Sequence, residues 1–406
     1  MLRPVRLGGV WRHGLVAVAL LATVFAGVRV FRPTDTLDLA HGRYPAPAPA
    51  TDRFYGELLA APLIVDDRIR VYAAANRVWA DGPVDAKMTT SAYWAFRRWP
   101  AVLVGVVVAG DRVVSRWSDG EVVAQRPDTG AVLWRASVGA RTRVYEGRRT
   151  GAKTVYDPPD LATATTPDGR PVVVATGVDE VTGLDADSGA VRWRRHRTSG
   201  EQRCAQVFTG PGIVVSVGCQ PSTVDVWDAG TGAARTWPDL PGAVTPVGCA
   251  VGRSQCTGVV GAGHGWVIGP AGTLTAAAGL TDRGDRLSGD TVVRVEGGDV
   301  VAYDAVSGAR RWSRPADGAV VLAVEPGVVH LLTPDHHVVS LELGTGDERS
   351  RIYAHIPDTH DLPWVAGYAY ASDGYVVIER LIPGGNPNGS DAEYYYQVPT
   401  LVLTGS

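Results

Sequence analysis

Four cysteines are the side chains of this 406-residue sequence with the clearest capacity for chemistry, and they are Cys204, Cys219, Cys249 and Cys256. Their spacing does not match the closely spaced cysteine pairs of zinc sites. Disulfides are therefore the favoured interpretation, and free buried thiols are the alternative. Cys204 and Cys219 flank a hairpin predicted around residues 209–212, while Cys249 and Cys256 bracket a loop short enough for one disulfide to close. We expect two disulfides, which agrees with export to an oxidising compartment.

Other residue types give no catalytic pattern. His336 and His337 fall in a predicted turn, and we favour the interpretation that they are exposed loop histidines. The alternative is a metal site that they form together with His355 and His360. Neither of the two lysines follows glycine, so the sequence has no phosphate-binding P-loop. It also has no H-E-x-x-H or G-x-S-x-G string. We predict no catalytic, cofactor-binding or metal-binding residue, and no cofactor.

One basic cluster stands out, formed by Arg192, Arg194, Arg195, His196 and Arg197. Its simplest interpretation is a solvated strand and loop. Its alternative is a contact for an acidic partner or for lipid headgroups. The formal net charge of the whole chain is -3, which argues against nucleic acid as a partner.

A sequence pattern recurs along the chain and defines the elements that must carry any site. It consists of an apolar strand, Asp or an equivalent, two residues, Ser or Thr, Gly, three residues and Trp. Clear copies occupy 121–134, 180–193 and 299–312, and weaker copies occupy 223–237 and 337–350. The predicted structural residues of the repeat are Asp128, Gly130, Trp134, Asp185, Gly189, Trp193, Asp228, Gly232, Asp304, Gly308, Trp312 and Gly346.

Each position of the repeat has a physical role. The alternating apolar residues predict a half-buried strand. The glycine supplies the positive φ of a tight hairpin turn, and the Asp and the Ser or Thr can bond to amides of that turn. The Trp begins the returning strand, where its large flat ring can fill the gap between adjacent sheets.

A unit of about 40 residues containing several short strands is typical of a β-propeller. The content of 49 glycines and 27 prolines suits short strands and tight turns. We expect a degenerate copy at 259–279 and a polar insertion at 148–168. The sequence predicts an all-β propeller of seven blades, in which residues 70–80 supply the strand that closes the ring. Eight blades is the alternative, if 53–100 forms a blade of its own.

The pattern Ala-x-Asp-x-x-(Ser/Thr)-Gly-x-x-x-Trp resembles the docking repeat of quinoprotein-type (PQQ-like) β-propellers. Residues 302–312 match it fully, whereas the second copy has Gly183 at the Ala position and the first has Arg126 at the Asp position. The resemblance covers about residues 100–403 and implies the fold. In that family the motif is structural, and many members carry neither quinone nor catalysis. A quinone-dependent dehydrogenase of this type would have adjacent cysteines, and this sequence has no Cys-Cys pair.

The N-terminal region predicts the location of the protein. Residues 14–31 form an apolar stretch close to the minimum for a membrane-spanning helix. Arginines precede it, so the positive-inside rule places residues 1–13 in the cytoplasm as a short tail. We expect an uncleaved transmembrane signal anchor, with a cleaved signal peptide as the alternative. Residues 32–52, which are rich in Pro and Ala, would form a stiff spacer, and residues 53–406 the propeller.

Together these patterns predict a single-pass protein of the cell membrane whose N-terminus is cytoplasmic and whose propeller lies outside the membrane. The expected function is non-catalytic, as a binding or scaffold module of the cell envelope. Its expected partner is an envelope protein, a peptide or a glycan, and the membrane is contacted through the N-terminal helix. The alternative function is that of a quinone (PQQ)- or metal-dependent oxidoreductase.

Overall fold

The computed structural model describes residues 19, 34–48, 53–86, 91–140, 144–197, 206–218, 224–316, 318–354, 363–372, 374–384 and 400–404. The predicted cytoplasmic tail and all but Ala19 of the predicted anchor at 14–31 lie outside these residues, as do Cys204 and Cys219. Within the described ranges, no helix is both long enough and apolar enough to cross a membrane.

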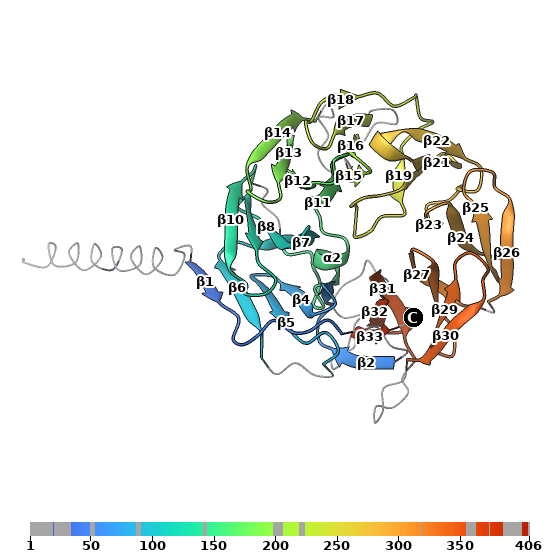
Figure 1. Ribbon diagram of the computed structural model, residues 1–406, viewed down its shortest axis with the longest axis horizontal. Coiled ribbons are helices and arrows are strands. Elements are labelled where there is room, and N and C mark those ends of the chain that lie inside the picture. Colours follow the sequence, from blue (N-terminus) through green and yellow to red (C-terminus); the bar gives the residue numbers. More distant parts are fainter. Residues whose placement is uncertain are drawn as a thin grey trace, which may run out of the picture.

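Antiparallel strands arranged in a ring make up nearly all the regular structure of the described residues, and they form eight sheets (Figure 1). The strands of the first four sheets are β1 (Thr34–Asp38), β3 (Leu63–Val65), β4 (Ile69–Ala74), β5 (Arg77–Asp81) and β6 (Trp94–Trp99); β7 (Leu103–Ala109), β8 (Arg112–Trp117), β9 (Glu121–Gln125) and β10 (Val132–Ser137); β11 (Leu161–Thr165), β12 (Pro171–Thr176), β13 (Glu180–Asp185) and β14 (Val191–His196); and β15 (Gln206–Gly210), β16 (Ile213–Val217), β17 (Val224–Asp228) and β18 (Ala234–Arg235).

The remaining four sheets complete the circle. Their strands are β19 (Thr245–Val247), β20 (Gly258–Gly261), β21 (His264–Ile268) and β22 (Leu274–Ala277); β23 (Arg286–Ser288), β24 (Thr291–Glu296), β25 (Asp299–Asp304) and β26 (Arg310–Pro315); β27 (Val320–Glu325), β28 (Val328–Leu332), β29 (His337–Glu342) and β30 (Glu348–Tyr353); and β31 (Val365–Ser372), β32 (Tyr375–Leu381), β33 (Thr400–Thr404) and β2 (Arg53–Leu58). The expected degenerate copy at 259–279 contains β20, β21 and β22. A short 3-10 helix, Pro270–Gly272, lies between β21 and β22.

Two sequence-based expectations about the ring require correction. Eight sheets are present among the described residues, whereas seven blades was the favoured prediction and eight the alternative; the chain between Leu63 and Trp99 forms a sheet of its own. The closing strand is also not 70–80, which lies inside that first sheet. Instead, β2 closes the ring by pairing with β33, from Arg53 opposite Thr404 to Leu58 opposite Thr400. The pairing of β2 with β33 thus completes the eighth sheet and closes the ring.

The spacer interpretation of residues 32–52 is wrong for the part that the structure describes. β1 pairs along its full length with β6, which makes the first sheet five-stranded. The following Pro/Ala segment forms neither helix nor strand, but it packs on the ring. Ala48 is buried, and its carbonyl oxygen accepts a 2.9 Å hydrogen bond from the Tyr375 hydroxyl. The segment therefore belongs to the folded unit.

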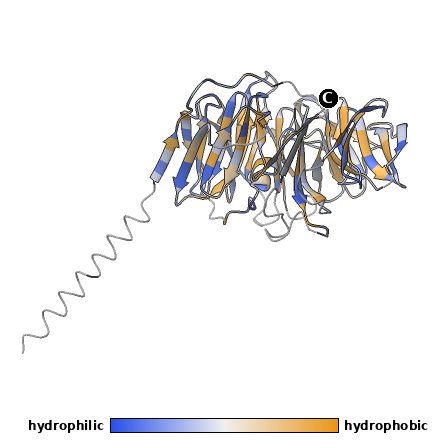
Figure 2. Cartoon of the chain, turned by 90° about the horizontal axis from the view of Figure 1, so that it is seen from below, coloured by the Kyte–Doolittle hydropathy of each residue, from blue (hydrophilic) through white to orange (hydrophobic). Residues whose placement is uncertain are grey.

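The core lies between neighbouring sheets, because both faces of the inner strands are apolar. β12 (PVVVAT) and β32 (YVVIERL) are almost wholly buried, and their β-branched residues suit a pleated surface packed on both sides. Viewed from the side, the sheets stand next to one another as the segments of a disc (Figure 2). The strands β7, β11, β15, β19, β23, β27 and β31, each the first of its sheet's four-stranded meander, lie nearest the ring centre, whereas β1 is the outermost strand of the first sheet.

The meander of each sheet gives the disc two distinct faces. The hairpin turns that join first to second strands and third to fourth strands lie on one side, which we name the turn face. The chain crosses from a fourth strand to the next first strand on the other side, which we name the crossover face. Trp99 ends β6 only a few residues before Leu103 begins β7, so both lie on the crossover face.

Candidate binding site at the centre of the ring

The repeat turns join the two outer strands of their sheets and form the frame of the ring. In the full copy, one carboxylate oxygen of Asp304 accepts hydrogen bonds from the backbone N–H and the hydroxyl of Ser307, each at 2.8 Å. The other carboxylate oxygen pairs with Arg311 at 2.7 Å. These donors hold the pKa of Asp304 well below its ordinary range. The ionised aspartate therefore links Ser307 and Arg311 across the turn, and we call this arrangement the clasp.

Asp185 and Asp228 make the same clasp at the second and third copies, with a Ser or Thr three residues later and an arginine seven residues later. Burial opposes ionisation of Asp185, but hydrogen bonds from Ser188 and the ion pair with Arg192 outweigh it and lower the pKa to about 2. One member of the basic cluster at 192–197 therefore has a structural role, because Arg192 forms the ion pair of this clasp.

The repeat tryptophans join each sheet to the next turn. The indole N–H groups of Trp134, Trp193 and Trp312 donate 2.8 Å hydrogen bonds to the carbonyl oxygens of Ala186, Ala229 and Leu343. Their rings lie against the turn glycines Gly189, Gly232 and Gly346, where a Cβ would come within 2.7 Å of the indole or closer. A glycine is required there both by its positive φ and by this contact.

Departures from the repeat have local explanations. Arg126, at the Asp position of the first copy, pairs with Asp128 instead, at 2.9 Å. Trp237, one residue late, still donates to the Gly272 carbonyl oxygen at 2.8 Å. Gly308 faces Ala278 and meets no tryptophan.

Sequence reasoning missed Trp94, which precedes the first copy. Its indole N–H donates to the Pro127 carbonyl oxygen at 2.8 Å, and its ring lies against Gly130. The repeat could have indicated this contact, because Gly189, Gly232 and Gly346 each face a tryptophan from the preceding sheet and Gly130 had none assigned.

Two segments enter the ring centre and narrow it. The first is the insertion between β10 and β11, which carries the short helix α2 (Ala152–Tyr156) (Figure 1). The second is the loop 249–256, closed by the Cys249–Cys256 disulfide that the sequence predicts. The two segments meet where Gly252 approaches Pro158 so closely that a Cβ would lie 2.7 Å from the proline ring. We call α2 and this loop together the plug.

Hydrogen bonds to neighbouring sheets hold the disulfide loop in place. The Thr209 N–H donates to the Arg253 carbonyl oxygen at 2.9 Å, and the Gln255 N–H donates to the Thr209 hydroxyl at 2.7 Å. The buried Ser254 hydroxyl accepts a 2.9 Å bond from the Thr163 N–H. The loop is therefore fixed to the third and fourth sheets.

A buried ion pair holds the insertion to the eighth sheet. Glu379 on β32 is fully buried and pairs with Arg148 at 3.3 Å. Glu379 also accepts hydrogen bonds from the Thr150 hydroxyl and the Tyr368 N–H. The Arg148 guanidinium lies 4.6 Å from the centre of the Tyr368 ring. These contacts tie the insertion that carries α2 to β32 of the eighth sheet.

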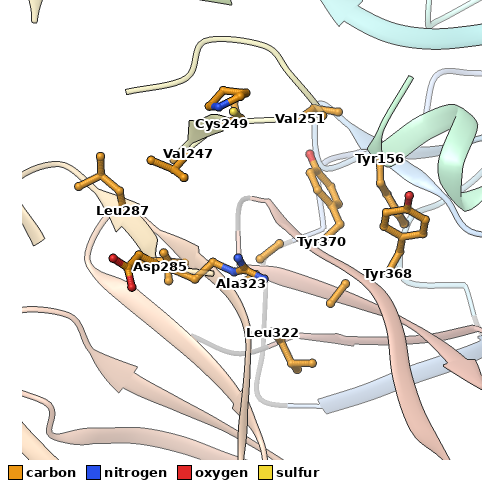
Figure 3. A pocket seen from close by; sticks show the side chains of 18 of the residues that line it. Tyr156, Val247, Cys249, Val251, Asp285, Leu287, Leu322, Ala323, Tyr368 and Tyr370 are labelled. Carbon is orange, nitrogen blue, oxygen red and sulfur yellow. The ribbon is translucent and has the colours of Figure 1, made fainter. Parts of the chain in front are cut away.

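The plug leaves a tyrosine-lined hollow of about 270 Å³ beside α2. Figure 3 shows Tyr156, Tyr368 and Tyr370 on one side of it, with Val247, Leu287 and Asp285 across from them. Tyr156 and Tyr370 stack with ring centres 4.9 Å apart. Burial raises the pKa of Tyr156 and of Tyr368, so both hydroxyls stay protonated at neutral pH.

A second hollow, of about 410 Å³, opens on the turn face of the plug. Its lining includes the β3–β4 turn with Asp66 and Asp67, the loop residues Ser254 and Gln255, and Tyr370. We name it the turn-face hollow. It combines apolar strand residues with exposed polar groups, which is the composition of a site that orients a bound chain or small molecule.

The histidines of the described residues do not assemble a metal site. His336 stacks on Trp364 with ring centres 4.4 Å apart, and His337 lies beside Tyr353. Within the described ranges no three His, Cys, Asp or Glu side chains are placed to share a metal ion. His355 and His360 lie outside the described residues.

Comparison with known proteins complements this geometry. A PQQ-type family model, described as outer membrane protein assembly factor BamB, matches residues 51–157 and 264–360, together about half of the chain. No curated protein matches the sequence. Among solved structures, the computationally designed Ika8 protein is 18% identical, with 86% of this chain and 99% of its own covered and a TM-score of 0.52, which shows the fold.

Two natural proteins are also similar in structure. BamB from Moraxella catarrhalis is 14% identical, with 89% of this chain and 100% of its own covered and a TM-score of 0.44. The quinohemoprotein alcohol dehydrogenase from Comamonas testosteroni is 14% identical, with 91% of this chain and 76% of its own covered and a TM-score of 0.44.

Proposed function

Because the chain belongs to the PQQ-like β-propeller family described as outer membrane protein assembly factor BamB, we propose that it is a non-catalytic binding or scaffold module of the cell envelope. Each of the eight sheets is one blade in this proposal. The apolar stretch at 14–31 anchors the chain in the cytoplasmic membrane, and the propeller lies outside it. The partner is an envelope protein or peptide.

The observation that carries this proposal is the plug. The plug is bonded to sheets that are far apart in sequence, through Glu379 on β32 and Thr209 on β15. It thereby forms a fixed surface at the ring centre, which we call the floor. A rigid floor costs little entropy when a partner binds, which is what a binding module needs. The polar groups of the turn-face hollow, Asp66 and Gln255 among them, are exposed on this floor.

The lining residues fit the alternative, a quinone-dependent oxidoreductase, less well. The quinone cofactors of such propellers are paired with calcium, and calcium takes six to eight oxygen ligands. Asp285 is the carboxylate that lines the tyrosine hollow, and one of its oxygens already accepts bonds from the N–H groups of Thr281 and Asp282 and pairs with Arg294. The backbone donors belong to the turn that precedes Asp285, and among the described residues no group of three or more His, Cys, Asp or Glu side chains is placed around it to hold a metal ion.

Site-specific photocrosslinking in living cells tests the proposal. A photoreactive residue at Gln255, in the turn-face hollow, is expected to give a discrete protein adduct. A matched control at Val306 lies on the same face but at the outer rim, and it is expected to give none. Equal yields at both positions, or no adduct at Gln255, would contradict a binding site at the ring centre.

A further inference from the structure

β1 joins the sequence before the propeller to one defined place on the disc. Thr34 lies opposite Trp99 and Asp38 opposite Ala95, so the first residue of β1 lies at the end of β6. That end is on the crossover face, because the chain passes from there to β7. The polypeptide that precedes β1 therefore reaches the disc on the crossover face.

Ion pairs lock β1 in this position. Asp35 pairs with Arg98 at 3.1 Å and with Arg135 at 2.6 Å, which ties β1 to the first and second sheets. Burial opposes ionisation of Asp35, but the two arginines outweigh it and lower the pKa of its carboxyl. The strand is thus charged and clamped at neutral pH.

The connection from β1 to the apolar stretch is short. Two residues separate Phe31, the last residue of that stretch, from Thr34. Three backbone steps span at most about 10 Å. The headgroup layer on each side of a bilayer is about 5–7 Å thick. Thr34 therefore lies at most about 5 Å beyond the headgroups when residues 14–31 span the bilayer, so the connection holds this edge of the disc at the membrane surface.

Exposed apolar side chains gather on the crossover face. They lie where fourth strands end, where first strands begin, and at the links between second and third strands. They form an arc over the sixth, seventh and eighth sheets to the first sheet, next to β1. Its members are Leu59, Trp99, Val295, Val320, Tyr353, Val365 and Ile382. On the turn face the exposed large apolar residues among the described ones are Leu39, Leu133, Val191 and Val306; Leu37 lies on β1 near that edge, and Val144 lies in the insertion between β10 and β11.

Trp99 occupies the position in this arc closest to the membrane segment. It is 47% exposed and pairs with Thr34, the first residue of β1. Tryptophan is enriched at the boundary between lipid and water, because its ring is apolar and its N–H can still reach a polar partner. An exposed tryptophan at this place suits the headgroup layer.

From the arrival of β1, the short connection and the apolar arc, we propose that the crossover face lies in the headgroup layer of the membrane that holds residues 14–31. This inference rests on the proposed anchoring. Its consequence is that the turn face, with its central hollow, points away from the membrane toward a partner in the envelope. The disc is held flat against the lipid and not raised on a spacer.

Depth-dependent spin labelling of the full chain in vesicles of phosphatidylethanolamine and phosphatidylglycerol tests the orientation. A spin-labelled residue replaces Val320 on the crossover face or, as the matched control, Val191 on the turn face. Both valines begin a strand, and they are 48% and 44% exposed. On transfer from detergent to vesicles, we expect collisions with a water-soluble nickel chelate to fall about threefold at 320, as for a group buried in the headgroup boundary, and to stay unchanged at 191.

Flotation of the vesicles separates the two proposals. Full chains that do not float with the lipid after an alkaline carbonate wash would overturn the anchoring and the orientation together. Chains that float while both labels remain equally accessible would overturn the orientation alone. A Leu37→Pro variant, in which proline disrupts the β1–β6 ladder, should float but lose the protection at 320. Unchanged protection in that variant would refute the clamp.

Discussion

Replacing Trp312 with alanine tests the docking frame on which the whole ring depends. The Trp312 side chain is buried between the sixth and seventh sheets, and its indole N–H donates to the Leu343 carbonyl oxygen at 2.8 Å. Removing a buried tryptophan costs about 3–5 kcal/mol through the lost transfer energy and the cavity left behind. We expect Trp312→Ala to lower the free energy of unfolding by that amount.

The glycine that faces this tryptophan makes the test sharper. Gly346 has φ +74, and a Cβ there would lie 2.7 Å from the indole of Trp312. Gly308 is its matched control, because it has φ +71 in an equivalent turn but its nearest neighbour would be 3.3 Å away. Both glycine-to-alanine changes should cost about 1–2 kcal/mol of backbone strain. Gly346→Ala should cost about 1–3 kcal/mol more, because the methyl group overpacks the contact.

A double-mutant cycle completes this experiment. In the Trp312→Ala background the indole that a Cβ at position 346 would overlap is absent. Gly346→Ala should then lower the free energy of unfolding no more than Gly308→Ala does, which corresponds to a coupling energy between positions 312 and 346 of about 1–3 kcal/mol. The assay is urea unfolding followed by circular dichroism, which does not depend on the deleted tryptophan. A loss below about 1 kcal/mol for Trp312→Ala, or equal costs at the two glycines, would refute the docking argument.

Three further predictions follow from single contacts. Cys249→Ser removes the disulfide that closes the plug loop and should lower the free energy of unfolding by about 2–3 kcal/mol relative to the oxidised wild type, measured by urea unfolding; an unchanged value would contradict the role of this disulfide in holding the loop. Glu379→Gln removes the buried carboxylate that pairs with Arg148 and should lower the free energy of unfolding by about 3–5 kcal/mol. Hydrogen exchange in α2 should rise, and unchanged exchange would contradict the role of Glu379 in holding the insertion. The Asp185 carboxyl stabilises the fold only when it is ionised, and its pKa is lowered from 3.8 to about 2. The difference in unfolding free energy between wild type and Asp185→Asn should therefore be constant above pH 4 and shrink as the pH falls toward 2. A difference that does not depend on pH would contradict the clasp.

The repeat explains why so much of the fold could be predicted. Its strand, turn and tryptophan are local patterns, so the copies around Trp134, Trp193 and Trp312 identify the architecture without any long-range information. The closing strand could not be identified in this way. Both 53–58 and 70–80 read as strands, and which of them pairs with the C-terminal sheet depends on the number of sheets in the ring.

The ring centre was beyond prediction because its contacts are distant in sequence. Arg148 and Glu379 are 231 residues apart, and no local pattern links them. α2 is one short turn of helix without an amphipathic repeat. β1 (TDTLD) is exposed along its length, so it lacks the alternation that marks a half-buried strand. The loop 249–256 was the exception, because its two cysteines marked it.

Titration of the full chain with pyrroloquinoline quinone and Ca²⁺, followed by absorbance and thermal melting, tests the central claim of a non-catalytic binding propeller most directly. We expect no saturable change in absorbance and an unchanged melting temperature, because the plug narrows the ring centre and one carboxylate oxygen of Asp285 is already engaged by Thr281, Asp282 and Arg294. A melting shift of several degrees that is lost in Tyr370→Ala, which alters the tyrosine hollow, would contradict it.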